Sequence, residues 1–128
     1  MTADSFTVSL RVWHPSLSDE EVIQAINLAP EVRQSVGAPR VNPAGDKLDG
    51  VYRRTYCSFL LVGKTLGIFT DSFEGLLPPL HSRADFFRRI SDERGRSELF
   101  VGVFAEASVG FTLDTKLMLA MASSSLEL

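Results

Sequence analysis

Alternation of apolar and polar residues near the N-terminus predicts a β-strand. Every second residue of this segment is apolar, namely Phe6, Val8, Leu10 and Val12. Side chains that repeat with a period of two point to opposite faces of a sheet. We therefore expect the aliphatic set to face the core, with Arg11 and Trp13 on the other face.

The next segment, residues 15–30, changes to the pattern of a helix. Pro15 lacks a backbone N–H, so the strand must end close to it. Ser18 and Glu21 have the spacing of a capping box, and acidic residues in a first turn suit the helix dipole. Apolar residues then recur at helical spacing as far as Pro30. The sequence predicts a helix that is capped by Ser18.

A long connection and a second strand follow. Residues 31–51 contain three glycines and two prolines without a sustained period, which predicts a long loop with a short extended piece around Val41. A loop of this length inside a small domain tends to carry function. Residues 51–64 are rich in aromatic and β-branched side chains and predict the second strand.

The second half of the chain continues to alternate helices and strands. Asp71 and Glu74 predict the start of a helix, and Pro78 with Pro79 predicts its end. Four more elements are expected: a helix capped by Ser82 and ended by Gly95, a strand over 98–106, a helix over 112–122, and the first residues of a strand at 126–128.

This order of elements favours an α+β fold in one domain, residues 1–128. We expect a two-layer sandwich with about four strands and with helices packed on one face. A ferredoxin-like arrangement is the preferred topology.

Composition and charge exclude several classes of function. The formal net charge is −3, so no overall positive field would attract nucleic acid or anionic lipid. One cysteine and two histidines are too few for a disulfide framework or an ordinary structural zinc site. The sequence contains no signal-peptide pattern and no membrane-spanning apolar run. We predict a cytoplasmic protein without cofactor or metal.

The chain resembles a bacterial family of small proteins, domain-of-unknown-function family 4279. The resemblance rests on FTVSLRVWHPSLSDEEVIQAINLAP, the VGAPR stretch, a strand that carries Tyr56, and the segment from ELFVGVF to the C-terminus. It implies a fold rather than an activity, and no site residue is carried over from it. Tyr56-Cys57 stands where the family suggests a tryptophan. The family's last strand usually continues further, so the resemblance implies that the C-terminal strand of this chain is a truncated form of it.

Basic and aromatic residues on the two predicted strands form the candidate binding face: Arg11, Trp13, Arg53, Arg54 and Tyr56. Arginine and large aromatic residues are frequent in protein interfaces. The alternatives are a solvated face with packed side-chain stems, or a platform on which single-stranded bases stack. We expect a protein partner and no nucleic acid, because the chain is acidic. A homodimer formed through an unpaired strand edge is a further possibility.

His14, Cys57 and His81 carry the competing hypothesis of a small hydrolase or metal-dependent enzyme, with Asp85 as a further metal ligand. Imidazole and thiolate groups can act as base and nucleophile when they meet in a cleft. A structural role for His14 at the strand end and a core position for Cys57 are the simpler interpretations. The sequence therefore favours a non-catalytic interaction module, for example a partner-binding protein of the immunity-protein type.

Overall fold

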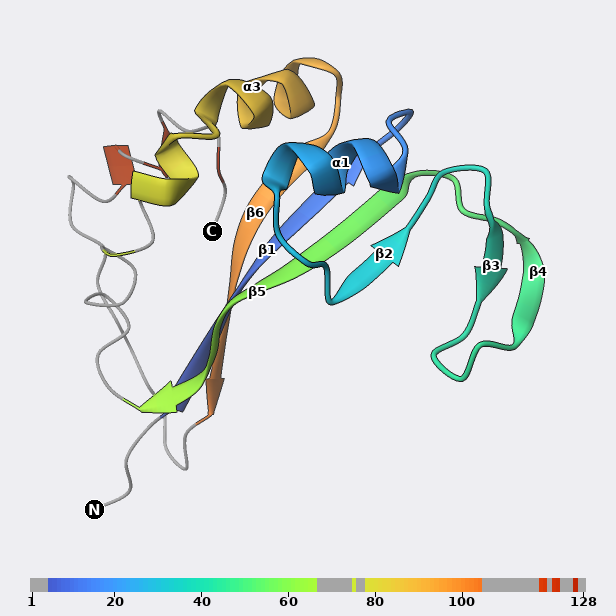
Figure 1. The fold of residues 1–128 in the computed structure, drawn as a ribbon, viewed down its shortest axis with the longest axis horizontal. Coiled ribbons are helices and arrows are strands. Elements are labelled where there is room, and N and C mark those ends of the chain that lie inside the picture. The colour runs from blue at the N-terminus through green and yellow to red at the C-terminus, as the bar shows by residue number, and fades with distance from the viewer. Residues whose placement is uncertain are drawn as a thin grey trace.

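The computed structural model describes most of the chain, and the account below concerns these residues: 5–66, 75, 78–104, 118–119, 121–122 and 126. Figure 1 shows an antiparallel sheet with two labelled helices beside it and a separate hairpin. The fold is therefore of the α+β class, as the sequence predicts.

The sheet has four strands in the order β2-β5-β1-β6. Strand β1 (Ser5–His14) lies between β5 (Thr55–Leu66) and β6 (Arg96–Phe104), and it is antiparallel to both. The predicted alternation in β1 is confirmed, because its aliphatic residues are buried while Arg11 and Trp13 are half-buried on the other face. A bulge near Val8 shifts the register with β5.

The segment expected to be a long loop contains three short strands instead. Strand β2 (Val32–Gln34) adds to the edge of β5, while β3 (Pro39–Val41) and β4 (Lys47–Val51) form a hairpin that projects beyond the sheet in Figure 1. Gly45 lies between β3 and β4 with a φ of 89°, which favours glycine in the turn. The short extended piece expected around Val41 is confirmed as β3. The strands β2 and β4 were not predicted, because strands this short have no readable period.

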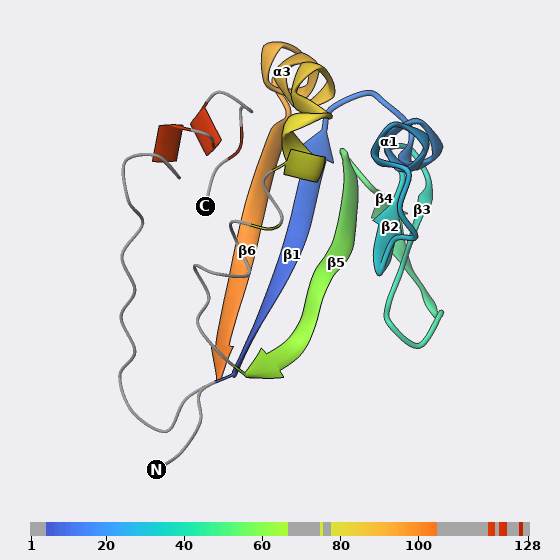
Figure 2. The same cartoon turned by 60° about the vertical axis from the view of Figure 1, so that its left-hand side comes forward.

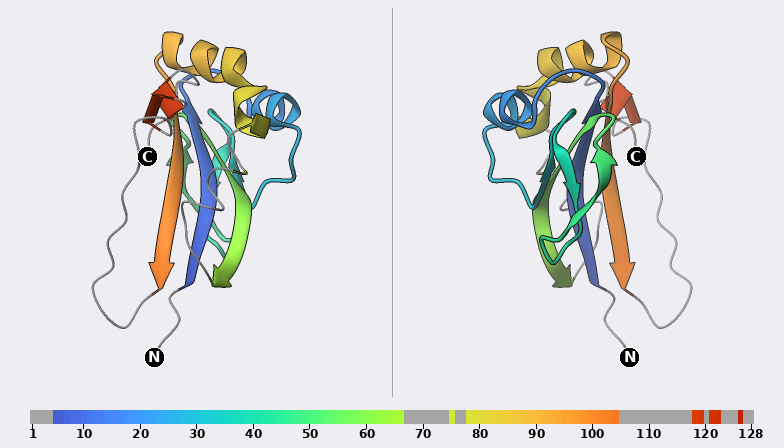
Figure 3. Two further views of the ribbon diagram at one scale, coloured as in Figure 1. Left: turned by 90° about the vertical axis from the view of Figure 1, so that its left-hand side faces the viewer. Right: turned by 90° about the vertical axis from the view of Figure 1, so that its right-hand side faces the viewer.

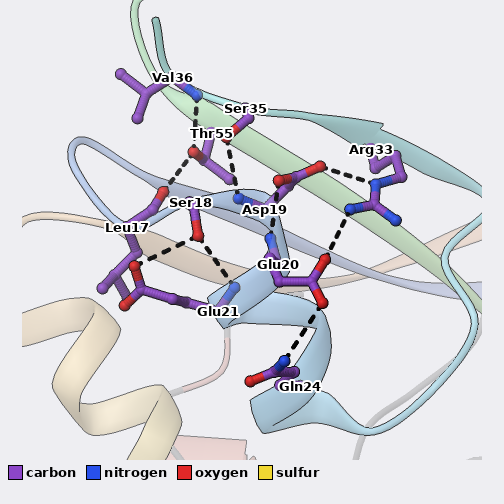
Figure 4. A network of polar contacts seen from close by, with 10 residues as sticks. All are labelled: Leu17, Ser18, Asp19, Glu20, Glu21, Gln24, Arg33, Ser35, Val36 and Thr55. Atoms are coloured by element: carbon purple, nitrogen blue, oxygen red, sulfur yellow. Dashed lines mark hydrogen bonds and ion pairs between the residues drawn. The ribbon is translucent and has the colours of Figure 1, made fainter. Parts of the chain in front are cut away.

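Strand β5 also begins later than predicted. Arg53 and Arg54 lie in an exposed bend that precedes Thr55, and therefore they are not on the strand. Thr55 is fully buried, and its hydroxyl donates to the carbonyl of Leu17 and accepts the N–H of Val36. This hydroxyl joins the turn after β1 to the turn after β2 (Figure 4).

Helix α1 (Asp19–Ile26) begins where the capping pattern predicts it. The hydroxyl of Ser18 accepts the Glu21 N–H at 3.2 Å and donates to the Glu21 carboxylate at 3.3 Å. Figure 4 shows that the acidic first turn also binds β2, because Arg33 donates to Asp19 at 2.8 Å and to Glu20 at 3.3 Å. This hydrogen bond from Arg33 is the main reason why the pKa of Asp19 is lowered.

Helix α3 (Ala84–Asp92) begins differently from the prediction. Its N-cap residue is Arg83, and the hydroxyl of Ser82 donates to the carbonyl of Pro79 at 2.6 Å instead of capping the helix. The prolines do not end a helix, because residues 78–81 are themselves helical. The predicted capping residues Asp71 and Glu74 lie outside the described residues.

The C-terminal region is described at few positions. Residues 118–119 and 121–122 are helical, which agrees with the expected helix in the described part of 112–122. Leu126 is buried but is not in a strand, and its N–H donates to the carbonyl of Met121 at 3.1 Å. The rest of the expected strand at 126–128 is outside the described residues.

The core lies between the helices and one face of the sheet. Val22 and Ile26 of α1 and Phe87 and Ile90 of α3 are fully buried together with alternate residues of β1, β5 and β6. Figures 2 and 3 show α3 lying across the end of the sheet at which β1 ends and β6 begins. None of the described helices is long and apolar enough to cross a membrane.

Candidate binding face and arginine pocket

The sheet face opposite the core carries rows of side chains that cross neighbouring strands; we call it the open face. Its members alternate with the core residues: Arg11 and Trp13 on β1, Tyr56, Ser58 and Leu60 on β5, Arg96, Glu98 and Phe100 on β6, and Val32 on β2. Leu60 is 48% exposed and Phe100 is 42% exposed. Large apolar side chains are therefore accessible beside charged ones.

Trp13 is held from both neighbouring strands. Its ring centroid lies 5.1 Å from that of Tyr56, and the guanidinium carbon of Arg96 lies 4.2 Å from the Trp13 centroid. The register places Tyr56 on β5 and Arg96 on β6 directly opposite Trp13. Aromatic pairs and cation–π contacts of this kind add stability beyond area burial and orient the rings.

A second contact group lies one row further along the open face. The guanidinium carbon of Arg11 is 3.8 Å from the ring centroid of Phe100, and Arg11 also contacts the Glu98 carboxylate at 3.4 Å. Arg96 approaches the same carboxylate at 3.7 Å. Glu98 therefore bridges two arginines and fixes their positions on the face.

The sequence identified only part of this site. The structure brings Arg11, Trp13 and Tyr56 together on adjacent strands, as predicted. Arg54 reaches the neighbourhood of Trp13 from the bend before β5, and nothing in the structure places Arg53 there. The residues of β6 were missed, although Arg96, Glu98 and Phe100 alternate with buried residues, which is a signal that the sequence offers.

An open pocket of about 310 Å³ adjoins the open face at the end of β1; we call it the arginine pocket. Its lining comes from the end of β1, from the bend before β5 and from the turn between α3 and β6: Trp13, His14, Pro15, Arg54, Arg94, Gly95 and Arg96. Three of these seven residues are arginines, and none is acidic.

His14 forms the buried wall of this pocket, and its hydrogen bonds define its tautomer. The Nδ1 atom accepts the backbone N–H groups of Ser16 at 3.0 Å and Leu17 at 2.9 Å. Nε2 must then carry the proton, and it donates to the Glu93 carboxylate at 2.8 Å. Both ring nitrogens are engaged, so His14 connects the turn after β1 to the end of α3.

Glu93 receives two charge-assisted contacts on the outer side of this junction. Arg89 donates to its second oxygen at 3.0 Å, one helical turn earlier. The hydrogen bonds from Arg89 and then from His14 lower the pKa of the Glu93 carboxyl. The carboxylate is therefore kept in the ionised form that accepts these bonds.

The turn between α3 and β6 is closed by a Schellman motif. The Gly95 N–H donates to the carbonyl of Ile90 at 2.7 Å, and the Arg94 N–H donates to Ser91 at 3.1 Å. Arg94 occupies the left-handed position with a φ of 69°, where glycine is usual. Gly95 is required for a different reason, because a Cβ atom there would lie 2.4 Å from the Trp13 carbonyl oxygen.

The residues of the enzyme hypothesis lie in different surroundings. Cys57 is fully buried opposite Val12, and burial raises the pKa of its thiol to about 11. A nucleophilic cysteine needs the opposite shift, towards the thiolate. His81 is exposed on the helical residues 78–81, whereas the His14 side chain is fully buried. No group of three or more potential metal ligands occurs among the described residues.

We compared the chain with known families, curated proteins and solved structures. The chain matches no family model, no curated protein and no solved structure.

Proposed function

We propose that this chain is a non-catalytic binding module whose open face docks an acidic surface of a protein partner. The observation that carries this proposal is the contact of Trp13 with Tyr56 on one neighbouring strand and Arg96 on the other. Side chains that are already ordered before binding lose less conformational entropy when a partner arrives. Tryptophan, tyrosine and arginine are also the residues most enriched among interface hot spots.

Charge favours an acidic partner. The open face and the adjoining pocket contain four arginines, Arg11, Arg54, Arg94 and Arg96, beside one glutamate, whereas the whole chain has a formal net charge of −3. This local excess of positive charge complements a negative surface and would accelerate association. Exposed Leu60 and Phe100 supply the apolar contact area that a stable interface needs.

Base stacking is the less favourable use of the same face. A nucleobase needs an accessible aromatic ring face, and that of Trp13 is already contacted by Tyr56 and Arg96. Phe100 is likewise covered in part by the Arg11 guanidinium. These contacts support a protein partner over single-stranded nucleic acid.

We further infer a ferredoxin-like arrangement and an interaction module of the immunity-protein type. The strand order supports the first inference, because β5 lies between β1 and β2, and β1 lies between β5 and β6. Two β-α-β units are interleaved in this way in ferredoxin-like folds. Membership of family 4279 stays a prediction that rests on sequence patterns alone.

The test is site-specific photocrosslinking in native lysate followed by quantitative binding. A photoreactive residue at Leu60 on the open face is compared with one at Gln24, which is exposed on α1. A protein captured only from position 60 is identified, purified and titrated against the wild type and an Arg11→Ala/Tyr56→Ala variant. We expect the variant to bind at least about tenfold more weakly.

A matched control replaces two exposed residues outside the face, Arg40→Ala and Arg88→Ala, and should leave the affinity unchanged. Equal capture from both positions, or equal affinities of all three proteins, would contradict the proposal. Capture of a nuclease-sensitive species or of a second copy of the chain would also overturn it, in favour of a nucleic-acid or homodimer interface.

A further inference from the structure

We propose that the arginine pocket binds a phosphate group. The pocket joins segments that are far apart in the sequence, because Pro15 follows β1, Arg54 precedes β5 and Arg94 precedes β6. Its guanidinium groups come from two of these segments, Arg54 from the bend before β5 and Arg94 with Arg96 from the turn between α3 and β6, so an anion can be approached from two sides. The inference does not depend on the protein partner proposed above.

Arg54 and Arg94 have no internal counterion among the described residues. Other arginines of the chain donate to named acceptors, for example Arg33 to Asp19 and Arg83 to the carbonyl of Ile26. The described part of the structure contains no ion pair, hydrogen bond or ring contact of the Arg54 or Arg94 side chain. Their charges are therefore available to an external anion.

The backbone at Arg94 supports a role for its side chain. A left-handed φ of 69° is unfavourable for a residue with a Cβ atom, and helices usually place glycine or asparagine at this position. Asn27 occupies the equivalent position of α1 with a φ of 60°. Backbone strain of this kind is concentrated at functional sites. The Arg94 side chain therefore lines the pocket from a backbone position that costs free energy, which supports a role for its guanidinium group.

Arg96 and Trp13 provide a preorganised wall. The stack of the Arg96 guanidinium on the Trp13 ring, at 4.2 Å, restricts the arginine side chain before any ligand arrives. The planar, forked donors of arginine match the geometry of phosphate oxygens and can bind them in pairs. A phosphate monoester also carries about −1.5 to −2 charges near neutral pH, which suits several arginines better than a single carboxylate does.

The phosphate could come from a free phosphorylated compound or from a phosphorylated side chain of a protein. The pocket volume of about 310 Å³ accommodates a phosphate together with part of the group that bears it. Trp13 and Arg96 also belong to the open face, so a phosphorylated side chain could enter from a docked partner. Only this second source rests on the proposed function.

Fluorescence of the purified chain, residues 1–128, provides a direct test, because Trp13 is its single tryptophan and lines the pocket. The titrants are inorganic phosphate, a blocked phosphoserine as a model of a phosphorylated side chain, and acetate as a carboxylate control, all at constant ionic strength. We expect a saturable change with at least one phosphate-bearing titrant, and much weaker binding of acetate.

The decisive variant is Arg54→Gln/Arg94→Gln, which should bind at least about tenfold more weakly than the wild type. The control Arg40→Gln/Arg88→Gln removes the same charge from exposed positions outside the pocket and should bind as the wild type does. A second variant, Arg94→Gly, relieves the strain of the left-handed φ and should therefore fold as the wild type does. It should also bind phosphate more weakly than the wild type.

If phosphoserine binds more tightly than inorganic phosphate, the ligand of the pocket is a phosphorylated side chain. The reverse order would indicate that the ligand is a free phosphorylated compound. The proposal is overturned if neither titrant gives a saturable change, if acetate binds as well as phosphate, or if control and pocket variants lose affinity equally. Because no partner protein is present, these outcomes are independent of the crosslinking result.

Discussion

The two faces of the same sheet have opposite chemistry. On the covered face, Leu10 of β1 lies beside Phe59 of β5 and Leu99 of β6, and all three are excluded from solvent. On the open face, the neighbouring residue Arg11 lies over Phe100, which is 42% exposed. One strand therefore contributes to stability with its even-numbered residues and to recognition with its odd-numbered residues, because successive side chains point to opposite faces.

The two faces contribute to the stability of the fold through different interactions. The covered face gains free energy from removing apolar area from water, at about 25 cal/mol per Å². The open face gains little from burial, since its contacts are ring stacks and ion pairs between partly exposed side chains, each worth about 1 kcal/mol or less. Its contacts order the side chains rather than hold the fold together.

The largest expected effect separates the two faces directly. Phe59→Ala leaves a cavity in the core and should lower the free energy of unfolding by about 3–5 kcal/mol. Phe100→Ala removes a partly exposed ring and should cost less than about 1.5 kcal/mol. Urea denaturation of both variants measures the difference. Similar losses would mean that Phe100 is covered in the folded protein, and the open face would then need another interpretation.

An intermediate effect on stability is expected at the turn between α3 and β6, which contacts the end of β1. Gly95→Ala forces a Cβ atom against the Trp13 carbonyl and should destabilise the protein by about 2–3 kcal/mol. Arg94→Gly, one residue earlier, should stabilise it by about 0.5–1 kcal/mol, because glycine adopts a left-handed φ without strain. Thermal unfolding of both variants measures whether the two changes in stability have opposite signs. Loss of stability in Arg94→Gly would show that the Arg94 side chain stabilises the fold, and its backbone strain would then no longer support a role in the pocket.

The smallest effect concerns the ion pair that joins α1 to β2. Arg33→Gln removes the hydrogen bond that lowers the pKa of Asp19 and should lower the free energy of unfolding only slightly near neutral pH, because ion pairs of exposed side chains contribute little. A carboxyl whose pKa is lower in the folded state contributes stability above its unfolded pKa. That contribution is lost as the pH falls through the folded value.

The difference in the free energy of unfolding between Arg33→Gln and the wild type should therefore disappear as the pH falls below about 4, the ordinary pKa range of an aspartic acid. Unfolding free energies measured from about pH 7 down to about pH 2 test this. The control is Arg88→Gln, because Asp85, the partner of Arg88 at 3.7 Å, is fully exposed. A gap that stays constant with pH would show that Arg33 stabilises the protein by packing rather than through Asp19.

Two residues of the enzyme hypothesis show what residue types leave undetermined. His14 and Cys57 are the residue types that nucleophilic catalysis uses, and their pairing partners place them on the same face of the sheet. The structure surrounds Cys57 with apolar groups and occupies both nitrogens of His14. Residue type alone carries no information about solvation or about hydrogen-bond partners, and these decide whether a group can react.

The sequence by itself determined the local features of this protein. The alternation in β1, the Ser18 cap of α1 and the α+β class follow from interactions between residues a few positions apart. The short strands β2 and β4 could not be predicted, because pairing with another segment stabilises them rather than their own pattern. Only the tertiary structure decided which residues surround Trp13 and which residues line the arginine pocket. Both depend on strand register and on the meeting of turns that are far apart in the sequence, and these follow from the packing of the whole chain.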